Sequence, residues 1–164
     1  MASVTLHPNQ AQDESNDDNK YIVFSLNGEL YGTRLLDVRE VVEPVYTKSV
    51  PNTVSFFHGV CNLRGQIIGV IGLRERFGIE TDPTKTAILM VFDTESGAIA
   101  AKADRIENVS VIDPINIERN PNIVTNIPHR YIVGIAKFEN RLITLIDLKS
   151  VLTFEEISEI GNSK

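Results

Sequence analysis

The stretch GVCNLRGQIIGVIGLRERF, residues 59–77, decides the fold because its pattern returns 75 residues further along the chain. The second copy is GIAKFENRLITLIDLKSVL, residues 134–152, and the two copies align without a gap. Their apolar residues coincide, as at Ile68 and Ile143. A repeated apolar skeleton of this kind predicts two similar half-domains packed against one another.

A second, weaker similarity relates DVREVV, residues 37–42, to DRIENV, residues 104–109, at a spacing of 67. A longer loop in the second half accounts for the difference between the two spacings. We therefore expect each half to contain about five strands, built from the same pattern.

Short runs rich in β-branched residues alternate with turn signals from Tyr21 onward. Asn27-Gly28 predicts a hairpin because both residues adopt the positive φ values of a type I′ turn readily. Asn140 predicts a second tight hairpin for the same reason. All seven prolines lie between the runs, where a missing backbone donor costs nothing. This spacing predicts an all-β barrel architecture rather than a helical or βαβ fold.

The two ends of the chain differ from its middle. Residues 1–19 are polar and acidic with few aliphatic side chains, which predicts a disordered tail. Residues 20–153 carry the strand pattern and are expected to form the folded domain. Residues 154–164 are expected to form a C-terminal tail, either frayed or as a short helix with three apolar side chains on one side, namely Phe154, Ile157 and Ile160.

Composition excludes several classes of function. The chain has 164 residues, 42% of them apolar, and a net charge of −6. This acidity argues against nucleic acid or an anionic membrane surface as a partner, because both require clustered Lys and Arg. No run approaches the roughly 20 apolar residues that a bilayer needs, so membrane insertion is not expected. A single cysteine, Cys61, and the lack of a signal-peptide pattern favour the cytoplasm.

The usual signatures of catalysis are missing from the sequence. There is no nucleophile elbow and no phosphate-binding glycine loop. His58 and Cys61 form an H-x-x-C pair, but a zinc site takes three or four protein ligands and no second cluster supplies them. Cys61 aligns with Ala136, which indicates a small buried side chain. We expect no catalytic residue, no metal and no cofactor, and interpret the chain as a non-enzyme.

Arg64 is placed on a turn that differs between the two copies. The first copy has Asn62-Leu63-Arg64-Gly65 and the second has Lys137-Phe138-Glu139-Asn140. Because the fold accepts either turn, it does not dictate Arg64. Arg64 is therefore either a solvated turn residue or a contact for a partner, and Asn62 either serves such a contact or satisfies backbone groups beside the turn.

Four segments together resemble one family of proteins. In order they are YGTRLLDVREVVEP, VPN, FFHGVCNLRGQIIGVIGLRERFG and the closing YIVGIAKFENRLITLIDLKSVL. This arrangement resembles the CheW family, the coupling proteins of bacterial chemosensory arrays, over roughly residues 20–153. The resemblance implies a mainly β fold of two SH3-like five-stranded β-barrel subdomains packed together, with short helices.

The resemblance also implies a function. It is that of a non-catalytic adaptor, which couples methyl-accepting chemoreceptors to the regulatory domain of a CheA-type histidine kinase. The adaptor is cytoplasmic and works at membrane-associated receptor arrays. Matching positions imply receptor contact for Arg64, Val38, Glu40 and Gly59, together with Asn62 of the same motif. Kinase contact is expected from one end of a barrel, where no motif singles out residues and Tyr46 and Phe56 are the candidates.

The chain departs from the family pattern at a few positions. Gly72 stands where an acidic residue is common, whereas Asp147 keeps that place in the second copy and is expected to cap the following helix. Thr33 and Arg34 replace a pair that is usually apolar and acidic. These departures bear on the identity of the partners more than on the fold.

Three other interpretations fit parts of the sequence. A coupling protein of a non-flagellar chemosensory pathway would carry the same motifs. An oligonucleotide-binding β-barrel would need exposed aromatic residues among basic ones, and the strand-like runs lack that pattern. A small hydrolase would have to use His58 without an evident partner for it.

Overall fold

The computed structural model describes residues 17–82, 84, 87–123, 125, 127–152 and 156. Most of the predicted N-terminal tail therefore lies outside the described residues, as does the C-terminal helix expected around Phe154, Ile157 and Ile160. The last residues of that predicted tail lead directly into the first strand, where Lys20 forms an ion pair with Asp17 at 2.9 Å.

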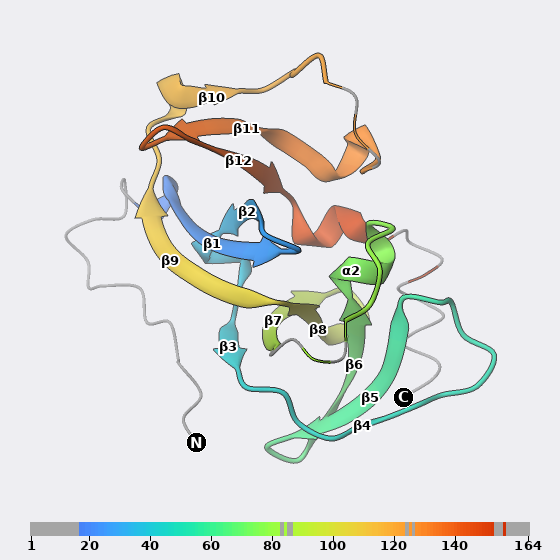
Figure 1. Ribbon diagram of the computed structural model, residues 1–164. Helices are drawn as coiled ribbons and strands as arrows, with labels where there is room; N and C mark the ends of the chain where they lie inside the picture. The colour runs from blue at the N-terminus through green and yellow to red at the C-terminus, as the bar shows by residue number, and fades with distance from the viewer. Residues whose placement is uncertain are drawn as a thin grey trace.

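Twelve strands account for most of the described chain (Figure 1). In chain order they are β1 (Lys20–Leu26), β2 (Glu29–Arg34), β3 (Glu40–Val42), β4 (Thr47–Lys48), β5 (Phe57–Leu63), β6 (Gln66–Gly72), β7 (Ile88–Thr94), β8 (Gly97–Ala103), β9 (Arg105–Val111), β10 (Ile117–Glu118), β11 (Ile132–Phe138) and β12 (Arg141–Ile146). The helices are short: α2 (Leu73–Arg76) and the 3₁₀ turns η1 (Leu35–Asp37), η2 (Pro114–Asn116), η3 (His129–Tyr131) and η4 (Leu148–Val151).

The strands form two six-stranded sheets. Sheet A has the order β3-β7-β8-β6-β5-β4, and sheet B has the order β10-β11-β12-β2-β1-β9. Figure 1 shows sheet B above sheet A, with α2 near their junction. The prediction of a mainly β fold is confirmed. Each half has six strands instead of the expected five, because the two-residue strands β4 and β10 add to the edges.

The two sheets are built alike, as the sequence repeat predicts. The aligned copies form β5-β6-α2 in sheet A and β11-β12-η4 in sheet B. In each sheet the second strand of this hairpin pairs in parallel with another strand, β6 with β8 and β12 with β2. The weaker similarity also agrees with the structure, since β3 and β9 occupy the corresponding outer position of each sheet.

Both faces of the central strands are buried, which explains their nearly continuous apolar sequence. In β1, Ile22 and Phe24 point into a large core shared by both sheets, whereas Tyr21 and Val23 point into a smaller core of sheet B. Strand β7 divides its side chains between the shared core and a smaller core of sheet A in the same way. The shared core holds the two halves together.

The predicted tight turns have the expected backbone. Asn27 and Gly28 both have positive φ, at 53° and 82°. Glu139 and Asn140 close the β11–β12 hairpin with φ of 49° and 61°. The prediction that Asp147 caps the following turn is also confirmed, since its carboxylate accepts a hydrogen bond from the Lys149 backbone N–H. Gly72, at the corresponding place, offers no side-chain cap to α2.

Two glycines allow the edge strands to cross closely over their neighbours. A Cβ on Gly59 would lie 1.9 Å from the carbonyl oxygen of Lys48 in β4. Gly134, its counterpart in the repeat, would meet the carbonyl oxygen of Glu118 in β10 at 2.7 Å. The short edge strands pack where they do because these positions carry no side chain.

Replacing Thr33 with valine is expected to stabilise the protein. It is fully buried in β2, and its hydroxyl has no hydrogen-bond partner among the described residues. Because a buried hydroxyl without a partner costs free energy, Thr33→Val should raise the free energy of unfolding by about 1 kcal/mol. Thermal unfolding followed by circular dichroism should show a melting temperature about 4 °C higher.

Thr94 provides the control for this substitution. Its hydroxyl donates to the carbonyl oxygen of Gly97 at 2.7 Å, so Thr94→Val should not stabilise the protein. A Thr33→Val variant that melts at a lower temperature than the wild type would contradict the inference that the Thr33 hydroxyl is buried without a hydrogen-bond partner.

Candidate functional site

Arg64 lies at the tip of the β5–β6 hairpin and is held by a buried carboxylate. Its guanidinium donates to Oε2 of Glu40 in β3 at 2.5 Å. The Arg64 side chain is 56% exposed, whereas that of Glu40 is 5% exposed. Arg64 has a φ of 51°, and Asn62 supports the turn by accepting a hydrogen bond from the Gly65 N–H at 2.8 Å. The Arg64 side chain is therefore accessible to a partner, while the buried Glu40 carboxylate holds its guanidinium in place.

The five residues assigned to the receptor divide into two groups. Arg64, Glu40 and Asn62 come together at this hairpin. Val38 is buried with the shared core, and Gly59 is buried beneath β4 without a side chain to offer. The structure thus gives packing roles to Val38, just before β3, and to Gly59, within β5.

The two residues assigned to the kinase have opposite environments. Tyr46 lies between β3 and β4 and is 85% exposed. Phe56 precedes β5 and is only 4% exposed, with the Arg76 guanidinium 4.4 Å from its ring centroid. Phe57 is buried as well, so neither of the two adjacent phenylalanines is exposed.

Two polar residues beside the hairpin escaped the sequence analysis. Arg39 forms an ion pair with Asp93 at 3.0 Å and also donates to the Gln66 side chain at 3.5 Å. Gln66 follows the Arg64-Gly65 turn directly, so Arg39 joins this hairpin to β3 and β7. The signal in the sequence was weak because a surface arginine beside a strand is ordinary.

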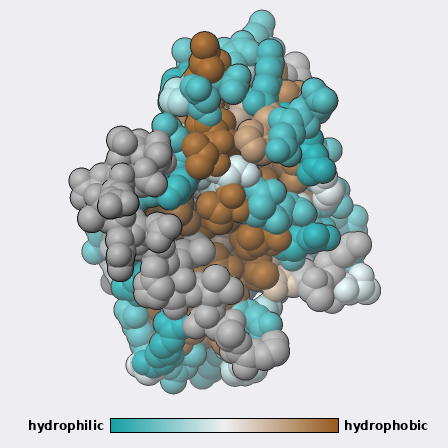
Figure 2. Space-filling view, turned by 90° about the vertical axis from the view of Figure 1, so that its left-hand side faces the viewer, coloured by the Kyte–Doolittle hydropathy of each residue, from teal (hydrophilic) through white to brown (hydrophobic). Residues whose placement is uncertain are grey.

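An apolar face on the edge strand β9 was also missed. Val109 and Val111 are 46% and 54% exposed, and Ile115 just beyond the strand is 86% exposed. Figure 2 looks onto the side of the molecule where β9 lies in Figure 1, and shows apolar side chains gathered there. Strand β9 pairs only with β1, so its other edge has no strand partner within the described part of the chain.

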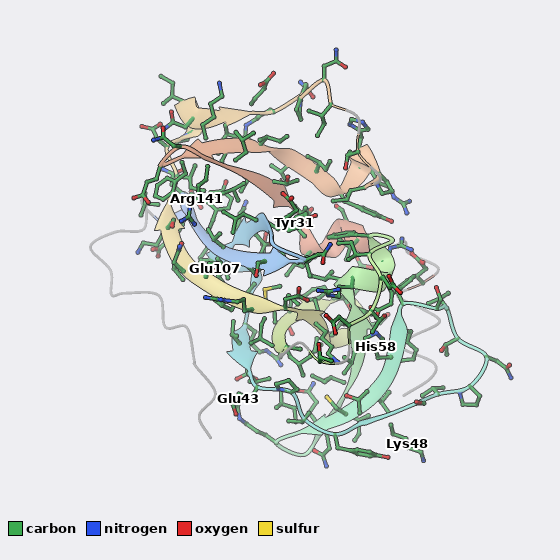
Figure 3. The ribbon with its side chains drawn as sticks, in the orientation of Figure 1. Tyr31, Glu43, Lys48, His58, Glu107 and Arg141 are labelled. Carbon is green, nitrogen blue, oxygen red and sulfur yellow. The ribbon has the colours of Figure 1, made fainter. Side chains whose placement is uncertain are left out.

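A second polar cluster surrounds the start of α2. His58 in β5 is labelled in Figure 3. Its Nε2 lies 3.1 Å from Oε2 of Glu75, and Thr81 donates to the same carboxylate. A Cβ on Gly72 would fall 1.9 Å from Glu75 Oε2 and 2.4 Å from the His58 ring. The His58–Glu75 pair thus fills the space that an acidic residue at position 72 would need. It lines a cavity of about 250 Å³ together with Lys102 and Asp104.

Glu75 is held in its charged form by this cluster. Burial alone would raise the pKa of Glu75, but hydrogen bonds from His58, Thr81 and its own backbone N–H, with the charge of His58, lower it from 4.5 to about 2. The cluster therefore stabilises α2 through a carboxylate within the helix, in place of the missing cap at Gly72.

The lowered pKa of Glu75 predicts a loss of stability in acid. Because the folded pKa lies below the unfolded value of 4.5, the stabilisation is complete above pH 5 and disappears as the pH falls towards 2. Glu75→Gln should therefore melt below the wild type at pH 6, and the two melting temperatures should converge near pH 2. Glu95→Gln, on an exposed turn, is the control. A constant difference from pH 6 to pH 2 would show that the charge of Glu75 contributes nothing.

Nothing in the described part of the chain resembles a metal centre, since no three His, Cys, Asp or Glu side chains gather there. Burial raises the pKa of the Cys61 thiol, which favours its unreactive protonated form. Among the same residues, no helix has the length and apolarity needed to cross a membrane. An exposed tyrosine, a fixed surface arginine and an apolar strand face are typical of a protein-binding module.

Comparison with known proteins identifies the kind of module. The family model for the CheW-like domain matches residues 20–156, so the chain belongs to the CheW family. The chemotaxis protein CheW of Bacillus subtilis is 34% identical over 140 residues, which cover 83% of this chain and 88% of that protein. The chemotaxis protein CheW of Treponema pallidum is 24% identical over 164 residues, 96% of each chain.

A solved structure agrees with the fold. The crystal structure of the scaffolding protein TtCheW from Thermoanaerobacter tengcongensis superposes with a TM-score of 0.77 at 33% sequence identity. The match covers 90% of this chain and 96% of that one. The resemblance inferred from the sequence motifs is therefore confirmed, and with it the likeness of the fold to a CheW scaffold.

Proposed function

We propose that this chain is a chemotaxis coupling adaptor that joins methyl-accepting chemoreceptors to the regulatory domain of a CheA-type histidine kinase, without catalysing a reaction itself. Its place of action would be the cytoplasmic side of membrane-associated receptor arrays. Membership of the CheW family and the likeness to a solved scaffolding protein support the adaptor role. The observation that carries the receptor contact is the surface arginine Arg64 held by the buried Glu40.

A fixed arginine suits a contact that has to be specific. The guanidinium presents its donors in a rigid planar fork, and a side chain that is already ordered loses less entropy on binding. Charge at an interface sets register and orientation more than affinity. The apolar face of β9 would supply the area that Arg64 cannot, so we propose both as parts of the receptor surface.

The kinase contact is proposed at the end of sheet A. Tyr46 is suited to it, because exposed aromatic side chains become strong anchors when a partner covers them. Phe56 would contribute from the interior, by supporting the start of β5 beneath Arg76. Val38 and Gly59 would contribute to the receptor contact in the same indirect way.

Oligonucleotide binding receives no support from the described surface. Tyr46 is the one aromatic residue among the exposed large hydrophobic side chains that the structure describes. Base stacking along a single strand requires several such platforms next to basic residues.

The proposal is tested by reconstituting the kinase with a receptor signalling fragment and following autophosphorylation. The wild-type chain should place the kinase under receptor control, and Arg64→Ala should weaken receptor binding about tenfold, in line with loss of one or two charged hydrogen bonds. Arg141→Ala is the matched control, since it removes the same charge from the corresponding hairpin of sheet B (Figure 3).

Folding must be checked separately, because Arg64→Ala also deprives the buried Glu40 of a partner. Circular dichroism should show a folded variant, and Arg64→Lys should recover part of the binding. A folded Arg64→Ala that couples like the wild type would rule out the arginine as a receptor contact. A wild-type chain that binds neither kinase nor receptor would refute the proposed function.

A further inference from the structure

Arg76, the last residue of α2, joins segments from both sheets. Its guanidinium forms two hydrogen bonds with the Glu156 carboxylate, at 3.0 and 3.1 Å, and its Nε donates to the carbonyl oxygen of Val151 at 2.7 Å. The same guanidinium lies 4.4 Å from the ring centroid of Phe56 and 5.2 Å from that of Tyr131. One side chain thus contacts the segment before β5, the segment before β11 and the C-terminal part of the chain.

These contacts are specific to an arginine. Only a planar guanidinium can stack against aromatic rings and bind a carboxylate through two nitrogens at once. The ion pair is also shielded from water, with side-chain exposures of 14% for Arg76 and 16% for Glu156. A shielded pair with this geometry is stronger and more directional than an ordinary surface pair.

The contacts lie at the junction of the two sheets. Helix α2 follows directly on β6 of sheet A. Phe77, next to Arg76, nevertheless packs against two tyrosines, with its ring centroid 5.8 Å from that of Tyr31 in sheet B and 6.1 Å from that of Tyr131. Val151 and Glu156 follow β12, the last strand of sheet B. The Arg76–Glu156 pair therefore connects an element rooted in sheet A to the chain that leaves sheet B.

We propose that Arg76 is a positioning residue that fixes the relative orientation of the two sheets, with Glu156 as its anchor. When Glu156 is bound, Arg76 is held between Phe56 and Tyr131 and the sheets keep one arrangement. When Glu156 is released, Arg76 loses two of its three polar contacts, and the sheets, which their shared core still holds together, sample a somewhat wider range of orientations.

This orientation matters for coupling if the proposed function is right. The proposed receptor surface combines Arg64 of sheet A with the apolar face of β9 in sheet B. The angle between the sheets then sets the distance between the charged and apolar parts of that surface. The Arg76–Glu156 pair would thereby tune receptor control without touching the receptor.

The orientation can be measured on the isolated full-length protein. Spin labels at Ser96 and Asn140, which lie on exposed turns of sheets A and B, report the distance between the sheets by pulsed electron paramagnetic resonance. The buried Cys61 is replaced by alanine, the residue at the corresponding position 136. We expect a narrow distance distribution for the otherwise wild-type chain and a clearly broader one for Glu156→Gln.

Hydrogen exchange provides a second readout, because Tyr131 and Val151 flank Arg76. Amides in η3 and η4 should exchange at least several-fold faster in Glu156→Gln. Glu139→Gln, an exposed turn variant with the same charge change, should match the wild type in both measurements. Arg76→Lys keeps the charge but loses the planar fork, and should behave like Glu156→Gln.

An unchanged distance distribution in both Glu156→Gln and Arg76→Lys would overturn the proposal. A lower melting temperature together with that unchanged distribution would mean that the pair stabilises the fold without positioning the sheets. Neither measurement uses a receptor or a kinase, so failure here would leave the proposed function standing.

Discussion

Gly59→Ala should destabilise the fold by about 3–4 kcal/mol, one of the largest losses for any single methyl group added to this protein. Gly59 has a φ of 136°, a region that is almost closed to residues with a side chain. The new Cβ would also lie 1.9 Å from the Lys48 carbonyl oxygen and 3.0 Å from the Ser49 Cα. Both are backbone atoms, so β4 has to move as a unit to relieve the clash.

Gly78→Ala separates the two causes of this loss. Gly78 also has a positive φ, of 72°, but a Cβ there would meet nothing within 4 Å. Its substitution should cost only about 1 kcal/mol, the usual penalty for a left-handed residue with a side chain. Chemical denaturation of both variants gives the comparison, and equal losses would mean that the close approach of β4 has no energetic weight.

The same experiment bears on the receptor assignment. Since Gly59 carries no side chain and is buried, a coupling defect in Gly59→Ala should follow the fraction of unfolded protein. A folded Gly59→Ala variant that fails to bind receptor would instead show that receptor binding depends on the backbone conformation of β5.

Arg74→Met should cost about 3–5 kcal/mol, because it breaks a buried ion pair from one side. Arg74 donates through Nε and Nη2 to the two carboxylate oxygens of Asp104, both at 2.7 Å, and through Nη1 to the Glu80 carbonyl oxygen. The hydrogen bond from Arg74 to Asp104 raises the pKa of the guanidinium, and burial opposes this only in part. Asp104 also accepts a hydrogen bond from the Asn27 N–H at 2.8 Å.

A double-mutant cycle measures the coupling of this pair. Arg74→Met leaves a carboxylate that is 16% exposed without its main partner, so Asp104→Asn in the same chain should restore part of the lost stability. Arg39→Met is the matched control, since Arg39 and Asp93 form an ion pair with side chains 44% and 60% exposed. That control should lose less than 1 kcal/mol. Purely additive losses at Arg74 and Asp104 would contradict a direct interaction between them.

The sequence predicted the features that depend on local chemistry. Asn27-Gly28 and Asn140 closed the predicted hairpins because only a few residues favour positive φ. The prediction that Asp147 caps the following turn was correct for a similar reason. A carboxylate at the start of a helical turn lies close to the backbone N–H groups of the next residues and accepts a hydrogen bond from one of them, here that of Lys149. The aligned copies predicted two alike halves because both keep the same buried positions.

Features that depend on distant segments could not be predicted in this way. Glu75 reads as an ordinary charged residue of a short helix, and its role emerges only when His58 is brought beside Gly72. Adjacent phenylalanines in a strand point to opposite faces, so the sequence is compatible either with one of Phe56 and Phe57 exposed or with a position outside the strand. Phe56 in fact precedes the strand, and Arg76 covers it. The Arg64–Glu40 pair joins residues that the motifs named separately.

The order of the strands has a consequence for how the chain is made. Sheet A is one continuous stretch from β3 to β8, whereas sheet B takes its first two strands from the start of the chain and the other four from its end. During synthesis sheet A can form completely before β9–β12, the strands that complete sheet B beside β1 and β2, have been made. Tyr21 and Val23, which pack against side chains from the later strands, then remain uncovered over much of translation, and such late, long-range pairing slows folding and favours aggregation. A ribosome that pauses before β9 would hold a nascent chain in which sheet A is complete and the apolar β1–β2 hairpin still lacks its neighbouring strands.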